Sequence, residues 1–338
     1  MRRFGSWRLR GEKLLVGLVL MGLLVGCGER SPTSGNRPVS LPPQPTLRTD
    51  VPAFRAESAY VWVEKQLSFG PRIPGTAAHQ ACGDWIVAKL RSYGALVHEQ
   101  RGTFKGTPIR NIIASFPGRD STRKRLLLSA HWDSRPYADQ DAQNKRQPVP
   151  GANDGASGVA VLLEIARLLG QEPPPGPVDI ILWDAEDLGQ EGVEDSYCLG
   201  SQFWLQNPEP YPPSAYLGGI NLDMVGARGA TFLQEGYSRL YAPNLLAFVW
   251  QVAAQLGYQT YFVPLEGDPI IDDPYYLSAR GGLPMVNIIH RQPHRPAFFP
   301  EWHTTQDNLS VIDQATLLAV GHTLTVVIYN LPVDFLPA

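Results

Sequence analysis

The chain has 338 residues, of which 43% are hydrophobic and 18% are charged. This composition provides enough apolar material for a large core and excludes the collagenous, coiled-coil and disordered classes. The formal net charge of -3 provides no basic field for phosphate groups, so nucleic acid is excluded as a partner on electrostatic grounds. Small molecules, peptides or proteins remain as partners.

Residues 1–27 have the pattern of a bacterial export signal. Five basic residues among the first thirteen precede an uninterrupted apolar run over 14–25. A membrane span needs about 20 apolar residues, so this shorter run predicts a signal peptide rather than a transmembrane helix. Leu24-Val25-Gly26-Cys27 resembles the lipobox of bacterial lipoproteins, which implies acylation of Cys27. The alternative is a plain secreted protein with an incidental cysteine.

We therefore expect an exported protein that is attached to a bacterial membrane only through lipid and faces the periplasm or the cell exterior. Export places Cys82 and Cys198 in an oxidising compartment, where two thiols can pair if the fold brings them together. Cys82 also lies on the apolar side of a predicted helix, where cysteine packs as a small hydrophobe. A disulfide and two buried thiols are both compatible with the sequence.

Two regions follow the signal. Residues 28–50 combine five prolines with polar residues and predict a disordered tether. Residues 51–338 continue with apolar periodic segments, without another linker or a repeat, and predict one catalytic domain. Two helices open this domain, at 54–67 and after the N-cap Thr76, the second ending at Gly94.

Four short apolar runs predict strands that are buried on both faces of a sheet. These runs cover 125–130, 178–183, 219–222 and 284–289, and helical patterns lie at 155–169, 243–256 and 314–329. Such alternation predicts a three-layer α/β/α domain with a central twisted, mostly parallel mixed sheet.

Ionisable residues collect where these strands end. In chain order they are His131 and Asp133, then Asp184, Glu186 and Asp187, then Asp223, and finally His290. Ligands of open α/β sheets bind outside the carboxyl ends of the strands, so this placement favours a functional crevice. The role of His290 stays undecided. Four other histidines have no such context and are expected at the surface or as helix caps: His79, His98, His294 and His322.

A turn at the start of a helix and a late loop add two further candidate metal ligands. The full set is His131, Asp154, Asp187, Asp223 and His303. Histidine nitrogen with carboxylate oxygen suits zinc, and three protein ligands with an open position make a catalytic site. Glu186 is then placed to act as a general base beside the metal. Each residue alone also fits a structural role, such as a helix cap for Asp154, and only their common location favours a metal site.

Seven motifs in order resemble the zinc-dependent glutaminyl-peptide cyclotransferases, or glutaminyl cyclases, of the zinc aminopeptidase superfamily. They are FGPRIPG (69–75), AHWDSRPYAD (130–139), GANDGASGVAVLLEIAR (151–167), WDAEDLG (183–189), NLDMVGA (221–227), IIDDPYYL (270–277) and EWHTTQDN (301–308). The resemblance covers nearly the whole domain. It implies the fold of the zinc-dependent exopeptidases.

The resemblance also implies roles for individual residues. One zinc would be held by Asp154, Asp187 and His303, with Glu186 as the acid/base. Three further matches concern the pocket: the proton-relay carboxylates Asp223 and Asp272, and the aromatic wall Trp302.

The sequence departs from the family at three positions. Asp187 replaces the more usual glutamate, which puts the ligand geometry in question more than metal binding. Another pocket tryptophan, expected shortly after Asp187, has no clear counterpart near Gly192, and Pro274 replaces a histidine that often follows the paired aspartates.

The implied reaction converts the N-terminal glutamine of a peptide or protein to pyroglutamate and releases ammonia. The alternative is a two-zinc aminopeptidase, in which His131 and Asp223 hold a second zinc and Asp154 bridges the two ions. The ligands cannot separate these enzymes because all five are present. Trp302 and the aspartate pair at 272–273 favour the cyclase, with one zinc per chain. A catalytically inactive binding protein would have lost Glu186 or a ligand. We expect a monomer.

Overall fold

The computed structural model describes residues 37–38, 46–293 and 297–332. The predicted export signal, Cys27 and most of the predicted tether lie outside these residues. No helix within the described ranges is long and apolar enough to cross a membrane.

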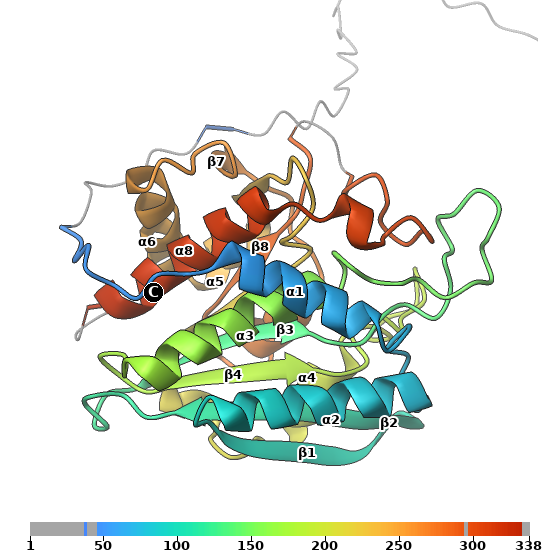
Figure 1. Ribbon diagram of the computed structural model, residues 1–338, viewed down its shortest axis with the longest axis horizontal. Coiled ribbons are helices and arrows are strands. Elements are labelled where there is room, and N and C mark those ends of the chain that lie inside the picture. Colours follow the sequence, from blue (N-terminus) through green and yellow to red (C-terminus); the bar gives the residue numbers. More distant parts are fainter. Residues whose placement is uncertain (1–36, 39–45, 294–296, 333–338) are drawn as a thin grey trace, which may run out of the picture. The chain divides into compact units, whose positions relative to one another are not determined.

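A six-stranded mixed sheet forms the centre of the domain (Figure 1). Its strand order is β1 (Leu96–Phe104), β2 (Thr107–Phe116), β4 (Val178–Trp183), β3 (Arg125–His131), β5 (Tyr216–Asp223) and β8 (Met285–Ile289). The last four strands run parallel to one another, whereas β1 and β2 form an antiparallel hairpin whose second strand pairs antiparallel with β4. The four parallel strands are the four that the sequence predicts.

Helices cover both faces of this sheet because alternate residues of each strand point to opposite sides. In β3, Leu126 and Leu128 pack in the larger core, while Leu127 packs in a second core on the other face. The larger core contains residues of α1 (Ala56–Leu67), α2 (Ala77–Ser92), α3 (Ala156–Gln171), α6 (Pro243–Gln255) and α8 (Gln314–Asn330). The second core contains residues of α4 (Leu199–Gln206) and α7 (Asp273–Ala279). This arrangement confirms the three-layer prediction.

Smaller elements lie beside β8. They are α5 (Gly236–Tyr241) and a parallel two-stranded sheet of β6 (Phe232–Gln234) and β7 (Phe262–Glu266). Short 3-10 turns occur at Pro213–Ala215 and Leu309–Val311.

The sequence did not predict the β1–β2 hairpin. Most of β1 is exposed or half-buried, so no apolar run marks it. The signal is instead the two-residue connection, in which Lys105 and Gly106 both have positive φ, of 49° and 83°. Two positive φ values in a two-residue loop are typical of a hairpin turn whose twist matches that of the strands.

Candidate metal centre and active site

The parallel strands end at one edge of the sheet, and the site residues lie there. β3 ends with His131 and β5 ends with Asp223, while Glu186 and Asp187 follow β4. Asp154 belongs to the turn before α3, and His303 lies in the loop before the last 3-10 turn. The fold thus brings together six residues from five widely separated segments of the sequence.

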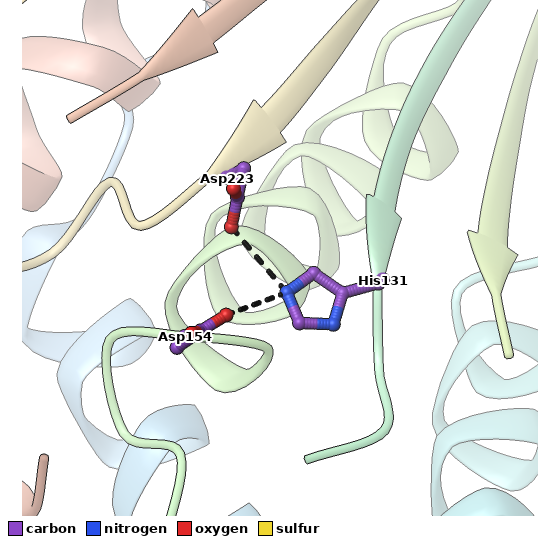
Figure 2. A group of neighbouring side chains, drawn as sticks. All are labelled: His131, Asp154 and Asp223. Carbon is purple, nitrogen blue, oxygen red and sulfur yellow. Dashed lines mark ion pairs between the residues drawn. The ribbon is translucent and has the colours of Figure 1, made fainter. Parts of the chain in front are cut away.

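One cluster consists of His131, Asp154 and Asp223 (Figure 2). The Nε2 atom of His131 lies 3.0 Å from Oδ1 of Asp154 and 3.3 Å from Oδ1 of Asp223. Figure 2 shows this ring nitrogen directed between the two carboxylates, which approach it from the turn before α3 and from the end of β5.

A second cluster consists of Asp154, Asp187 and His303. Nε2 of His303 lies 3.2 Å from Oδ1 of Asp187 and 3.7 Å from Oδ2 of Asp154. In each cluster the candidate ligand atoms lie within 4.8 Å of one another. Asp154 therefore directs one carboxylate oxygen to each cluster.

The hydrogen bonding of these groups fits a metal ion. Oδ2 of Asp187 is buried and has no hydrogen-bond partner among the described residues, and Nε2 of His131 faces Oδ1 of Asp223 at 3.3 Å without a well-aligned hydrogen bond. Buried polar atoms normally have partners, because leaving one without a partner costs about 1–3 kcal/mol. A cation would satisfy them, and this donor set of imidazole nitrogen and carboxylate oxygen is the one that zinc prefers.

Two buried carboxylates outside the ligand set hold the turns that carry the ligands. Asp133 accepts hydrogen bonds from the backbone N–H groups of Glu186 and Asp187, at 3.0 and 3.1 Å. Asp307 accepts from the N–H groups of Asn153 and Asp154, at 2.8 and 3.0 Å. These four hydrogen bonds fix the backbone on both sides of the second cluster.

Gly155 is required where these two turns meet. Its φ is 99° and its ψ is -47°, a conformation that L side chains rarely adopt. A Cβ atom at this position would lie 2.3 Å from the carbonyl oxygen of Asp133. The absence of a side chain therefore allows the turn with Asp154 to pack against the segment that follows β3.

Glu186 has the environment of an acid/base group. Its side chain is 14% exposed, and its Oε1 accepts a hydrogen bond from the Sγ of Cys198 at 3.3 Å. Burial, together with the charge of Asp187 and Asp272, raises the pKa of Glu186 well above its usual range, against an opposing effect of His131. A carboxyl group with a raised pKa can take up and return a proton near neutral pH.

Asp272 and Asp223 adjoin Glu186 in the same cavity. Asp272 accepts hydrogen bonds from Nδ2 of Asn287 at 2.6 Å and from Nδ2 of Asn221 at 3.3 Å. Burial and the neighbouring charge of Asp223 raise the pKa of Asp272 to about 7. Burial also raises the pKa of Asp223 to about 6, with Asp154 and Asp187 acting in the same direction.

Sequence reasoning missed several of these supporting residues. Asn221 and Asn287 are polar residues within apolar strands, and a buried polar residue in such a run must find a hydrogen-bond partner. That interruption was a usable signal. Asp307 offered none, because an aspartate in a loop is common.

The candidate ligands of the second cluster open onto a cavity of about 520 Å³. Asp223, Glu186 and Asp272 line it as well, and so does Trp302. The indole of Trp302 stacks on the imidazole of His303, with ring centroids 3.7 Å apart. This contact places a flat apolar surface beside the second cluster. Gly192, near which no counterpart of the expected second tryptophan is found, is exposed and lines the cavity.

The structure corrects one expectation about the histidines and decides between the two alternatives for the cysteines. The prediction that His79 is a surface or capping residue was wrong, because it is buried, stacks on Trp132 and lies 2.8 Å from Oδ1 of Asp184. The sequence could not reveal this, since Asp184 lies far along the chain. Cys82 and Cys198 are free, buried thiols.

The model of peptidase family M28 matches residues 111–328 of the chain. The chain is similar to the solved glutaminyl cyclase of Porphyromonas gingivalis, with 48% identity, a TM-score of 0.77 and coverage of 80% of this chain and 96% of that one. For the glutaminyl cyclase of Bacteroides thetaiotaomicron bound to N-acetylhistamine, the identity is 44%, the TM-score 0.78 and the coverage 84% and 100%.

A structure described as a leucine aminopeptidase precursor from Bacteroides thetaiotaomicron is about as similar, with 43% identity, a TM-score of 0.78 and coverage of 85% and 100%. The chain spans 41% of the length of the first curated relatives, fungal proteins named probable zinc metalloproteases, at 28% identity. These similarities include both cyclases and peptidases.

Proposed function

Because this chain belongs to peptidase family M28, we propose that it is a zinc-dependent glutaminyl-peptide cyclotransferase. It converts the N-terminal glutamine of peptides or proteins to pyroglutamate and releases ammonia. The observation that carries this proposal is the composition of one cavity. There, a three-ligand cluster, the acid/base candidate Glu186 and the aromatic wall Trp302 lie together. The identity of 44% and 48% to solved glutaminyl cyclases supports the same reaction.

Asp154, Asp187 and His303 would hold one zinc. When bound, zinc supplies Lewis-acid polarisation of the γ-carboxamide carbonyl of the substrate glutamine. The open side of this cluster faces the cavity, where a substrate can approach. Asp187 provides a carboxylate in place of the more usual glutamate, and its Oδ2 atom, which is buried without a hydrogen-bond partner, supports its role as a ligand.

Glu186 would move the proton that the reaction transfers. The α-amine of the glutamine forms a bond to its own side-chain carbonyl carbon, and the bond from that carbon to the amide nitrogen breaks. Glu186 takes a proton from the amine and returns it to the nitrogen that leaves as ammonia. Asp272 and Asp223, which also have raised pKa values, share protons with Glu186. Asn221 and Asn287 keep Asp272 in place.

A two-zinc aminopeptidase is the second candidate, and one specific observation favours it. The cluster of His131, Asp154 and Asp223 also directs one imidazole nitrogen and two carboxylate oxygens toward one another, so the chain has donors for a second ion. Asp154 would bridge the two ions. A peptidase needs an activated water, which two ions hold together, whereas a cyclase uses the amine of its own substrate.

One assay separates these candidates. The purified domain is incubated with a glutaminyl peptide and with leucyl amide, and pyroglutamate, ammonia and free amino acid are measured. We expect pyroglutamate and ammonia from the first substrate and no leucine from the second. Release of leucine without any pyroglutamate would show that the enzyme is an aminopeptidase and not a cyclase. Removal of zinc with a chelator should abolish either activity, and added zinc should restore it.

We also propose that the protein is exported and held at a bacterial membrane through acylated Cys27, where it acts as a monomer. The sequence before the domain supports export and attachment, since its apolar run is too short for a transmembrane helix and ends at a lipobox-like cysteine.

A further inference from the structure

One segment of the cavity mouth, residues 190–197, follows directly after the Glu186–Leu188 turn, and we call it the rim segment. All eight of its residues line the cavity, and residues 190–194 are exposed to solvent. When the N-terminal glutamine of a substrate lies at the metal cluster, the next residue of that substrate must lie in this mouth. The rim segment is therefore placed to contact the residue that follows the glutamine.

The rim segment has a defined conformation. The N–H of Gln190 donates to Oγ of Ser196 at 2.9 Å, and the N–H of Val193 donates to the carbonyl of Gln190 at 3.0 Å. Asp195 is held by the guanidinium of Arg280 at 2.6 Å and, through its carbonyl, by Nζ of Lys105 at 2.8 Å. Ordering a surface before binding reduces the entropy that a ligand must offset.

The charge of the mouth is not balanced. Asp139 and Asp195, which both line the cavity, form ion pairs with Arg135 and Arg280. Glu191 and Glu194 are exposed, and neither belongs to any ion pair in the described part of the chain. Two negative charges at the entrance therefore remain available to a cation.

Apolar surface lies at the same mouth. Val193 is 50% exposed and Ile271 is 58% exposed, and both line the cavity. Single exposed apolar side chains are ordinary features of a protein surface. Here, however, two of them share one entrance with two uncompensated carboxylates, so the mouth offers both apolar contact and negative charge.

Lysine and arginine combine an apolar stem with a cationic end, and they match this surface. We propose that the rim segment and Ile271 select peptides that carry lysine or arginine directly after the N-terminal glutamine. The stem packs on Val193 and Ile271, and the cationic end lies near Glu191 and Glu194. An acidic residue in that position is repelled. This inference rests on the proposed cyclase function in one respect only, namely that the first residue of the substrate is glutamine.

The test compares kcat/KM for the tripeptides Gln-Lys-Gly, Gln-Leu-Gly and Gln-Glu-Gly. We expect the lysyl peptide to exceed the glutamyl peptide on the order of 10-fold, since each exposed ion pair contributes a few-fold and the glutamyl peptide reverses the sign. The difference should shrink as salt is added, because salt screens exposed charges. Equal values for the three peptides, or a preference for the glutamyl peptide, would overturn the proposal.

Variants locate the effect. In the double variant Glu191→Gln/Glu194→Gln the ratio of kcat/KM for the lysyl peptide to that for the glutamyl peptide should fall to about 2 or below. In Glu191→Lys/Glu194→Lys the preference should reverse. The control, Glu57→Gln/Glu64→Gln, removes the same charge from exposed positions of α1 that do not line the cavity, and it should keep the wild-type ratio. A wild-type ratio in the rim variants would refute the proposal. Absence of pyroglutamate from all three peptides would instead refute the cyclase function.

Discussion

Replacement of Gly155 by alanine tests whether the packing of two turns determines the metal site. The added Cβ would lie 2.3 Å from the carbonyl oxygen of Asp133 and 3.2 Å from Nη2 of Arg72. Asp133 holds the backbone of Glu186 and Asp187, and Gly155 directly follows Asp154. The substitution must therefore push apart the two turns that carry metal ligands.

The expected loss of stability has two parts. An L residue in this sparsely populated backbone conformation costs about 1–3 kcal/mol. Relief of the clash with backbone adds about 1–3 kcal/mol, the usual cost of overpacking. For a domain of this size the total corresponds to a fall in Tm of roughly 5–20 °C.

Gly94→Ala is the matched control. Gly94 has a φ of 87°, and a Cβ there would meet nothing within 4 Å. This variant has the conformational cost without the clash, so the difference between the two Tm values, roughly 3–10 °C, measures the clash.

Thermal unfolding is recorded with and without zinc, because an ion that binds only the folded state raises Tm by an amount that grows with the logarithm of its affinity. We expect the rise in Tm caused by zinc to shrink in Gly155→Ala and to persist in Gly94→Ala. Identical unfolding of the two variants, with the same response to zinc, would refute the argument.

Four further outcomes follow from the site. Glu186→Gln should retain zinc and lose turnover by about 10²- to 10⁴-fold, as measured by ammonia release and elemental analysis, and near-normal turnover would assign the proton transfer to another group. His131→Ala should keep one zinc per chain after dialysis against a weak chelator, whereas a fall from two zincs to one, with cleavage of leucyl amide, would establish the aminopeptidase. Cys82 and Cys198 should resist a thiol reagent in the folded domain, because both are buried and burial raises the pKa of Cys82 to about 11. After unfolding without reductant, both thiols should react with the reagent. If neither reacts, the two cysteines form a disulfide. Cys27→Ser should release the protein from the detergent phase, and retention there would contradict the lipid anchor.

The part of the fold that could be predicted from the sequence consists of strands that are buried on both faces of the sheet. The four parallel strands are short apolar runs, so their composition together with their length distinguishes them from helices and loops. The β1–β2 hairpin lies at the edge of the sheet, where exposure removes the apolar signal and leaves only the turn at Lys105 and Gly106.

The residues of the candidate site also fall into a group that the sequence predicts and a group that it does not. His131, Asp187 and Asp223 were predictable because they lie at strand ends, which the topology of a parallel sheet must bring together, whereas Asp154 and His303 come from a turn and a loop. The residues that hold the site were not predictable, because Asp307 and Cys198 acquire their partners only through tertiary contacts. The pairing of His79 with Asp184 shows the same limit, since no local pattern connects those two positions.

The shared carboxylate of Asp154 means that the two clusters cannot be occupied independently. Oδ1 of Asp154 faces His131 and its Oδ2 faces His303, so one carboxylate would serve as ligand to both positions. Occupancy at one position would therefore alter the affinity at the other. A descendant of this chain could gain or lose a second ion by altering neighbours of Asp154 while keeping every ligand, so the ligand residues alone do not record which chemistry such a protein performs.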